Sequence, residues 1–303
     1  MYDFINKLQD VMLFNDVIPP HLDITSTKIN RFKSQGICKH NCCFYSIFYN
    51  QIGAYFGCWR RDIHVKWFAK NFESLTVQEK QNYLHQKEKL RKENEAKKDI
   101  AKLRCKTKWD HSIEACESHA YLIKKRIKPI YCRQHGEDLI IPIYDHFGEI
   151  QSLQSIHPDG FKLYEEGSSY KGGYLPLGEK INGTLRLCEG YATGCSIYEA
   201  IGEPVFVCFT ANNLIHIAKW IRKKYPHFPI QICADDDRRT EKKIGKNIGL
   251  IAAIHAAKEI NATVIYPDFT LIPHSENLTD FNDLFCVSGI EAVENQLLKG
   301  VSK

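Results

Sequence analysis

Acidic residues stand where two short apolar segments of the chain end. The segment TLRLCEG contains Glu189, and the segment PIQICADDD ends in Asp235, Asp236 and Asp237. Short apolar runs bounded by turn signals are typical of buried strands in a parallel sheet, and ligands of such sheets bind beyond the carboxyl ends of the strands. We therefore expect these carboxylates to converge at one sheet edge. Because neighbouring carboxylates repel one another, the expected occupant is a hard cation such as Mg²⁺.

The elements that must position these acids alternate regularly after residue 183. Alternation of strands and helices predicts a parallel sheet with helices on both of its faces. The pattern predicts strands at 184–189, 205–210, 230–234 and 263–266, helices at 192–201, 212–225 and 245–260, and a basic loop at 238–243.

A mixed region precedes this alternation. The sequence predicts a helix at 113–127, followed by a hairpin-like pair of strands at 139–144 and 150–156. A small α+β region is therefore expected before the parallel sheet.

Five basic residues are candidate contacts to nucleotide or DNA phosphates. Lys162 and Lys171 lie in the mixed region, whereas Arg238, Arg239 and Lys243 follow the aspartates directly. A single lysine is more often an ordinary surface residue, and a run of charges is often only a solvated loop. Both interpretations stay open at this point.

The N-terminal part has the composition of a small sheet. Residues 29–67 are rich in aromatic and β-branched residues and are interrupted by glycines, which predicts short antiparallel strands. The sequence CKHNCC, from Cys38 to Cys43, is followed by Cys58 and His64. A structural zinc site uses two closely spaced ligand pairs, and only one irregular cluster is present. We therefore predict a cysteine-rich turn and strand without zinc.

A charged segment at 77–108 contains no glycine or proline. Glu88 with Lys92, and Glu93 with Lys97, are pairs four residues apart in the favourable order. The segment is predicted to be a long, solvated, basic helix that joins two globular parts. It is either a plain spacer or a spacer that also contacts nucleic-acid phosphates.

Length and composition suit a globular protein of several domains. The net charge of +5 is a mild basic excess, which permits a polyanionic partner without requiring one. No apolar run approaches the roughly 20 residues that cross a bilayer. The N-terminus carries acidic residues, unlike a signal peptide. The cysteines are scattered through apparent strands, as is typical of reduced, buried thiols rather than of a disulfide framework. We expect no membrane association and a cytoplasmic location.

The expected division is an α+β domain at 1–72, a basic helical linker at 73–112, an α+β subdomain at 113–182 and an α/β domain at 183–303.

Three acidic motifs occur in order along the expected sheet: EGYATG at 189–194, ADDDRRTE at 234–241 and DFNDL at 280–284. With the upstream sequences FGCWR at 56–60 and GGYLPLG at 172–178, the chain resembles Toprim-domain DNA primases of phages, plasmids and integrative elements. The resemblance implies a Toprim catalytic domain at 183–303 and a primase-core subdomain at 113–182.

The same resemblance implies residue roles. Glu189 matches the glutamate that acts in acid–base chemistry or metal binding, and Asp235 and Asp237 match the paired aspartates that ligate Mg²⁺. Asp280, with Asp283, matches the later acidic motif and is expected among the metal ligands. The implied cofactor is Mg²⁺ or Mn²⁺.

The implied reaction is nucleotidyl transfer from nucleoside triphosphates, which makes short primers on single-stranded DNA during replication of a mobile element. In such a reaction divalent ions activate the attacking 3′-hydroxyl and neutralise the leaving pyrophosphate. The sequence holds no GxxxxGK[ST] phosphate loop, so a separate replicative helicase is the expected partner. Two other functions stay open: a Toprim-type nuclease, and a non-catalytic nucleic-acid-binding accessory protein. The intact acids argue against the accessory protein.

Overall fold

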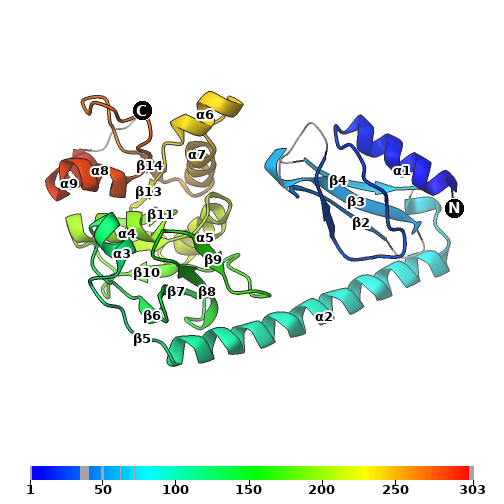
Figure 1. The fold of residues 1–303 in the computed structure, drawn as a ribbon, viewed down its shortest axis with the longest axis horizontal. Coiled ribbons are helices and arrows are strands. Elements are labelled where there is room, and N and C mark those ends of the chain that lie inside the picture. The colour runs from blue at the N-terminus through cyan, green and yellow to red at the C-terminus, as the bar shows by residue number, and fades with distance from the viewer. Residues whose placement is uncertain (1, 35–40, 49–50, 62, 71, 300–303) are drawn as a thin grey trace. The chain divides into compact units, whose positions relative to one another are not determined.

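The computed structural model describes residues 2–34, 41–48, 51–61, 63–70 and 72–299. The chain divides into two compact units, residues 1–95 and 96–303, which are considered separately below (Figure 1). Helix α2 (Val77–Asp110) begins in the first unit and ends in the second. No helix in the described ranges is long and apolar enough to cross a membrane.

The first unit is a four-stranded antiparallel sheet with one helix on it. The strands pair in chain order: β1 (Asn30–Phe32), β2 (Cys43–Ile47), β3 (Gly53–Cys58) and β4 (Ile63–Phe68). The prediction of a small antiparallel sheet in this region is therefore confirmed. Two short 3₁₀ turns, η2 (Trp59–Arg61) and η3 (Phe72–Ser74), follow β3 and β4.

Helix α1 (Tyr2–Phe14) covers one face of this sheet. Its apolar side chains recur every three or four residues, so they form one stripe, and Leu8 and Met12 are fully buried. They pack against Tyr45 and Phe56, which lie on the same face of neighbouring strands. This cluster is the hydrophobic core of the first unit.

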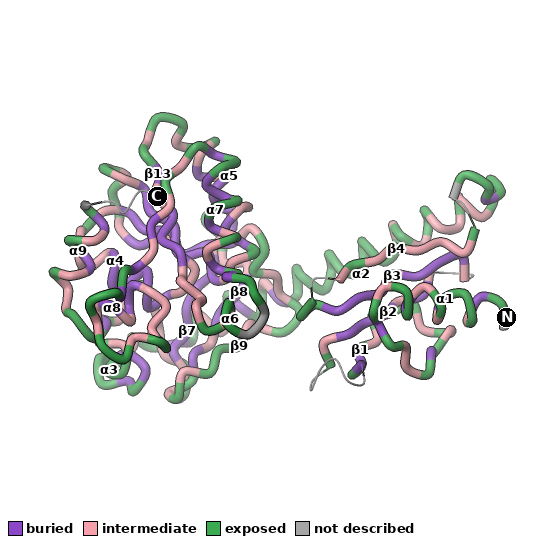
Figure 2. The backbone as a smooth tube through the Cα atoms, turned by 90° about the horizontal axis from the view of Figure 1, so that it is seen from above, coloured by how far each residue is buried: buried purple, intermediate pink, exposed green. Residues whose placement is uncertain are grey.

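The charged segment forms a single helix of 34 residues, α2, as its sequence predicts. Most of its residues are exposed, as Figure 2 shows. Arg91 lies 2.7 Å from Glu88 and 2.9 Å from Glu95, one turn away on either side. Only Ala101 and Cys105 of α2 are buried. These ion pairs between successive turns support the solvent-exposed part of the helix around Arg91.

The second unit begins with an antiparallel sheet. Its strands also pair in chain order: β5 (Ile113–Glu114), β6 (Arg133–His135), β7 (Asp138–Tyr144), β8 (Ile150–Ile156) and β9 (Lys162–Tyr164).

The helix predicted at 113–127 is much shorter. Only α3 (Ala120–Lys125) is helical, because the preceding residues pair as β5. His119 caps the helix by accepting the N–H of Tyr121, and Arg126 ends it in the left-handed conformation. A helical pattern of apolar residues was thus overridden by strand pairing at its start.

A second, mostly parallel sheet carries the predicted alternation. Its strand order is β10 (Leu175–Leu177), β12 (Val205–Val207), β11 (Leu185–Cys188), β13 (Ile230–Cys233) and β14 (Thr263–Ile265). The last four strands are parallel, and β10 is an antiparallel edge strand from the segment before the alternation begins.

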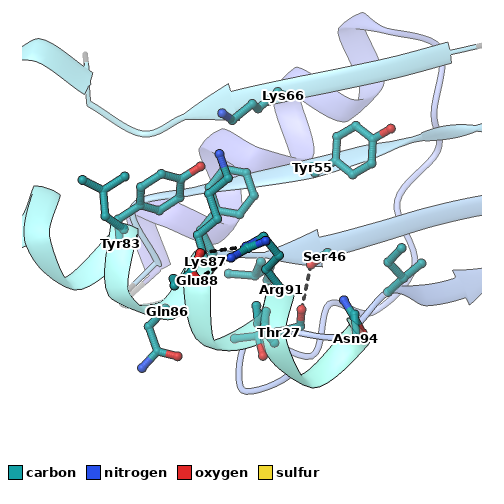
Figure 3. Close-up of a pocket in the computed structure, with 15 residues that line it drawn as sticks. Thr27, Ser46, Tyr55, Lys66, Tyr83, Gln86, Lys87, Glu88, Arg91 and Asn94 are labelled. Carbon is teal, nitrogen blue, oxygen red and sulfur yellow. Dashed lines mark hydrogen bonds and ion pairs between the residues drawn. The ribbon is translucent and has the colours of Figure 1, made fainter. Parts of the chain in front are cut away.

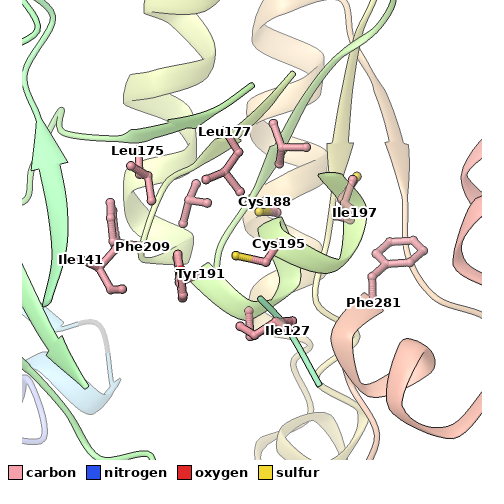
Figure 4. Packing of buried hydrophobic residues seen from close by; sticks show 14 of the residues in the cluster. Ile127, Ile141, Leu175, Leu177, Cys188, Tyr191, Cys195, Ile197, Phe209 and Phe281 are labelled. Atoms are coloured by element: carbon pink, nitrogen blue, oxygen red, sulfur yellow. The ribbon is translucent and has the colours of Figure 1, made fainter. Parts of the chain in front are cut away.

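Helices pack on both faces of this sheet, which confirms the predicted α/β architecture. On one face lie α4 (Tyr191–Ile201), α8 (Phe281–Ser288) and α9 (Ile290–Lys299), packed around Cys188 and its neighbours (Figure 4). On the other face α5 (Ala211–Lys224) and α7 (Ile248–Ile260) pack on the alternate residues Leu187 and Ile232.

The segment predicted as a basic loop at 238–243 is instead a short helix, α6 (Arg238–Ile244). Asp237 is its N-cap residue, and Gly245 ends it with a φ of +71°. Its arginines, lysines and glutamate are good helix formers, so the backbone completes a helix where charge alone indicated a solvated loop.

Replacement of Leu8 by alanine tests the core of the first unit. We expect Leu8→Ala to lower the free energy of unfolding by about 2–5 kcal/mol, because the side chain is fully buried against the sheet. Leu13→Ala, on the same helix but 52% exposed, is the matched control and should change it little. Urea unfolding followed by circular dichroism measures both. Equal midpoints for the two variants would contradict the packing of α1.

Candidate active site

The parallel pairing of β11 with β13 places acidic residues at one edge of the sheet. Cys188 is opposite Cys233, so Glu189 and Asp235 leave neighbouring strands within one residue of the same level. This is the placement expected from the two apolar segments. The Cβ that alanine would add at Gly194 of α4 would lie 2.6 Å from Val207, so glycine there lets α4 lie closely against the sheet behind Glu189.

Glu189 lies between β11 and α4 and has an unusual proton affinity. Burial, and then the negative charge of Asp237, raise the pKa of Glu189 to about 7. The backbone N–H of Ala211, at the start of α5, and the ammonium of Lys162 favour the charged form and oppose this rise. Without a bound cation, the carboxyl group therefore holds its proton more tightly than an exposed glutamate does.

Asp235 is the most strongly perturbed acid of the cluster. Burial, followed by the charges of Glu189 and Asp280, raises its pKa well above the usual range of an aspartate. Its Oδ1 atom is buried and has no hydrogen-bond partner among the residues that the structure describes. A buried, unpaired carboxylate oxygen is costly unless something else completes its coordination.

The neighbouring aspartates have different surroundings. Asp237 Oδ2 accepts the N–H of Gly249 at 3.0 Å, at the start of α7. A Cβ on Gly249 would lie 2.7 Å from the carbonyl oxygen of Asp235, so only glycine allows this close approach. Asp236 instead accepts a hydrogen bond from Asn247 at 2.8 Å and pairs with Arg238 at 3.1 Å. Asp236 therefore holds the loop and helix α6, and its charge is balanced there.

Asp280 reaches the cluster from a distant part of the chain. The N–H of Asp236 donates to the carbonyl of Thr279 at 2.7 Å, which fixes the residue before Asp280 beside the aspartate loop. Asp280 caps α8 by accepting the N–H of Asp283 at 2.7 Å. Burial, and then Asp283, raise its pKa, while Lys125 opposes the rise.

Both carboxylate oxygens of Asp283 have partners within the protein. Oδ2 accepts the N–H of Thr279 at 2.9 Å, and Oδ1 lies 3.4 Å from the Nζ of Lys125. This geometry suits a residue that holds the turn before Asp280 better than a residue that contacts a cation.

The acids interact electrostatically, but their oxygens do not form a closed cage. Throughout the described ranges, no three carboxylates place ligand atoms within 4.8 Å of one another. The placement of Glu189 and Asp235 at one sheet edge is therefore observed, whereas the close convergence expected of the carboxylates is not.

Of the five predicted phosphate contacts, the structure brings Lys162 to this cluster. Lys162, on β9, keeps solvent access, yet surrounding protein atoms and the charge of Lys125 lower its pKa. Asp280, Asp235 and Glu189 act in the opposite direction, which shows that its ammonium faces the acids.

The other four candidates differ. Arg238 donates to the carbonyls of Ser275 and Leu278 at 2.9 and 3.0 Å, so its guanidinium fastens a loop. Lys171 and Arg239 are exposed, and the Lys243 side chain lies outside the described part of the structure.

Several residues of the site were not found by sequence reasoning. Lys125 and Asn247 contact the acidic segments, and Thr193, inside the EGYATG motif, donates its hydroxyl to Asp280. Lys125 lies more than 150 residues before its partner Asp283, so no local pattern could have indicated it. Only Thr193 had a signal in the sequence, because its hydroxyl group lies inside the EGYATG motif.

A second group of possible metal ligands lies in the first unit. The Sγ atoms of Cys42, Cys43 and Cys58 lie within 4.8 Å of one another, and Cys38 lies outside the described residues. The antiparallel register places Cys43 opposite Cys58, which the irregular spacing in sequence did not indicate. Burial and the neighbouring Cys58 raise the pKa of Cys43 to about 11. The prediction that zinc is absent is therefore neither confirmed nor overturned.

The family comparison agrees with the geometry of the sheet edge. The family model of the Toprim domain matches residues 184–291, which contain all three acidic motifs. These residues form a Toprim domain. The Toprim domain accounts for the parallel sheet, the helices on both faces and the acids that follow β11 and β13.

Curated relatives extend the similarity beyond the Toprim domain. One DNA primase TraC of Escherichia coli is 27% identical over 220 residues, which cover 69% of this chain, and a second is 32% identical over 140 residues, which cover 45%. These relatives confirm the resemblance to DNA primases. The chain spans only 21% and 10% of their respective lengths.

Solved primase structures are also similar. The primase fragment of the bacteriophage T7 primase-helicase is 14% identical, with a TM-score of 0.44 over 62% of this chain and 77% of that chain. The Aquifex aeolicus primase fragment with zinc-binding and RNA polymerase domains is 13% identical, with a TM-score of 0.45 over 98% of this chain and 85% of that chain.

The raised pKa values predict how metal-free stability depends on pH. A carboxyl group whose pKa is higher in the folded protein binds its proton more tightly there, so stability falls as pH rises from the unfolded value of about 4 through the folded pKa. Asp235→Asn removes one of the repelling charges. In EDTA at pH 8 we expect the variant to melt about 2–4 °C higher than the unchanged protein. The difference in melting temperature should become smaller at pH 5, where the carboxyl group carries its proton and repels its neighbours less.

Asp236→Asn is the control for this measurement, because it removes the same charge from the next residue. At this position the substitution removes an ion pair with Arg238 and does not relieve a repulsion, so the melting temperature of the variant should not rise. Equal shifts in both variants would show that the acids of the edge do not repel one another as described.

Proposed function

We propose that this chain is a DNA primase that makes short primers on single-stranded DNA, by metal-dependent nucleotidyl transfer, during replication of a mobile element. The observation that carries this proposal is the group of acids at the carboxyl edge of the Toprim sheet. In that group the buried Asp235 Oδ1 has no hydrogen-bond partner among the described residues. The names of the curated relatives support the same reaction.

The residues present fit Mg²⁺ or Mn²⁺. Their ligand atoms are carboxylate oxygens, which these ions prefer. Burial, and then repulsion by neighbouring carboxylates, raise the pKa of Glu189, Asp235 and Asp280, and a bound cation would oppose this rise. We propose Glu189, Asp235, Asp237 and Asp280 as the residues that hold the ion. Asp283 contributes by positioning the turn before Asp280, through Thr279 and Lys125.

When bound, the ion would supply charge neutralisation on the nucleotide phosphates and activation of the attacking hydroxyl. The protein contributes a proton site and a cation beside it. Before an ion binds, Glu189, with a pKa of about 7, can hold or release a proton on its carboxyl group near neutral pH. Lys162 offers an ammonium that faces the acids and can bind a nucleotide phosphate. Lys171 and Arg239, both exposed, are proposed as outer phosphate contacts.

The partners proposed are single-stranded DNA, nucleoside triphosphates and a separate replicative helicase. The sequence has no phosphate loop of the GxxxxGK[ST] type with which to drive unwinding itself. A cytoplasmic location follows from this role and stays a proposal.

Primer synthesis is the direct test. The protein is incubated with single-stranded DNA, labelled nucleoside triphosphates and Mg²⁺ or Mn²⁺, and short products are resolved on a gel. We expect Asp235→Asn, Asp237→Asn and Glu189→Gln each to lower the rate at least about a hundredfold, because ion-dependent stabilisation of the transition state contributes several kcal/mol. Each substitution preserves side-chain size and removes charge.

Asp236→Asn is again the matched control and should lose far less activity, because its carboxylate serves Asn247 and Arg238. Protein that nicks DNA with the same acids but makes no primers would favour the Toprim-type nuclease. Protein that binds DNA and has neither activity would favour the accessory protein.

Zinc content is a separate test of the first unit. We propose that no zinc is bound, because the cysteines of this region lack the two closely spaced ligand pairs of a structural zinc site in the sequence. Metal analysis of purified protein is expected to find no stoichiometric zinc. One tightly bound zinc that is lost in Cys43→Ser but retained in Cys116→Ser, an exposed cysteine outside the cluster, would reverse this proposal.

A further inference from the structure

The sheet of the first unit has two chemically different faces. Alternate residues of a strand point to opposite faces, so Tyr45 and Phe56 pack under α1 while Phe44, Phe48 and Tyr55 lie on the other face. On β4 the other face carries His64, Lys66 and Phe68. A solvated face usually carries polar side chains and a buried face aliphatic ones, whereas this face combines aromatic rings with cations.

The first half of α2 closes one side of this face into a groove. The groove has a volume of about 790 Å³, and all the residues that line it belong to the first unit. Figure 3 shows Tyr83, Lys87 and Arg91 on α2 turned toward Tyr55 and Lys66 on the sheet. Both the sheet and the helix thus present side chains to one space.

Three aromatic rings lie around one ammonium group beside this groove, and of these residues Phe48, Tyr83 and Lys66 line it. The Nζ of Lys66 lies 4.9 Å from the ring centre of Phe68, 5.8 Å from that of Tyr83 and 6.0 Å from that of Phe48. The rings lie 5.5–6.1 Å from one another and are tilted or edge-on rather than stacked. Lys66 is exposed, so its charge is held beside the rings and remains open to water.

The charge of the first unit suits a negatively charged ligand. Residues 1–95 hold 14 of the chain's lysines and arginines and 10 of its acids, which accounts for four of its five net positive charges. Arg91 is balanced by Glu88 and Glu95, so Lys66 and Lys87 supply most of the positive charge of the groove.

We propose that this groove binds single-stranded nucleic acid, with bases stacked on Tyr55, Phe48 and Tyr83 and phosphates beside Lys66 and Lys87. Unpaired bases stack on aromatic side chains, and phosphates pair with cations along the strand. An apolar peptide helix in the same place would cover the Lys66 ammonium without supplying an anion, which is costly. Duplex DNA keeps its base faces stacked inside the helix and cannot use the rings.

This inference deepens the proposed primase function by adding a strand-binding site that is separate from the acidic cluster. A strand held on the first unit would not depend on divalent ions, because the groove offers cations and rings rather than carboxylates. Binding and primer synthesis can therefore be measured independently.

Binding of a fluorescein-labelled dT16 oligonucleotide to the full chain, followed by anisotropy in EDTA, tests the site. We expect Tyr83→Ala to weaken binding about tenfold, because stacking of one base is lost, while Tyr83→Phe keeps the ring and should bind normally. Lys66→Ala should weaken binding and reduce the slope of log affinity against log salt by about 0.7, the value for one phosphate contact on a single strand. An oligonucleotide carrying 2-aminopurine should lose fluorescence on binding if its base stacks on a ring.

Lys92→Ala, an exposed lysine of α2 that does not line the groove, is the matched control and should change affinity little. Primer synthesis is measured separately, with divalent ion present, so its loss in Asp235→Asn would leave the groove assignment intact. If Tyr83→Ala alters the circular dichroism spectrum, Tyr55→Ala takes its place. Variants that keep their fold and bind as tightly as the unchanged protein, or equal affinity for duplex and single strand, would overturn the proposal.

Discussion

The parallel register between β11 and β13 is the constraint on which the candidate active site depends. Because Cys188 stands opposite Cys233, the chain leaves both strands at the same level, and the acids that follow are forced into one neighbourhood. A shift of one residue would turn the apolar side chains of the shifted strand from one helix layer to the other, and would turn the acid that follows that strand as well. The two apolar helix layers therefore fix the geometry of the charged edge.

Holding several acids at this edge is energetically unfavourable, and the surrounding backbone offsets part of that cost. The start of α5 offers a backbone N–H to Glu189, and the start of α7 offers one to Asp237. These donors lie at helix N-termini, where the helix dipole also favours negative charge. Burial, and then the remaining repulsion, raise the pKa values of Glu189 and Asp235, and a bound cation would relieve that repulsion.

The two units use their sheets in different ways. The Toprim sheet is covered by helices on both faces, so its chemistry can lie only at its edge. The sheet of the first unit is covered by α1 on one face, and its other face presents rings and cations. A mostly parallel sheet thus concentrates charge at strand ends, whereas an antiparallel sheet with one solvated face can offer an extended surface.

The sequence alone determined the class of the second unit and the identity of its main acids. Short apolar runs, helical runs between them and acids at their ends are local patterns, and each reports on its own strand. Because each pattern is local, two predictions were wrong. The segment predicted as a basic loop is a helix, Arg238–Ile244, and residues 113–127, predicted as one helix, contain a strand before a short helix. Tertiary structure decided what depends on contacts between distant segments. It paired Lys125 with Asp283 and used Arg238 to fasten a loop rather than to meet solvent. It also gathered three thiols at the start of β2 and the end of β3. These outcomes follow from strand register and from burial of charge, which depend on parts of the chain that a local pattern does not include.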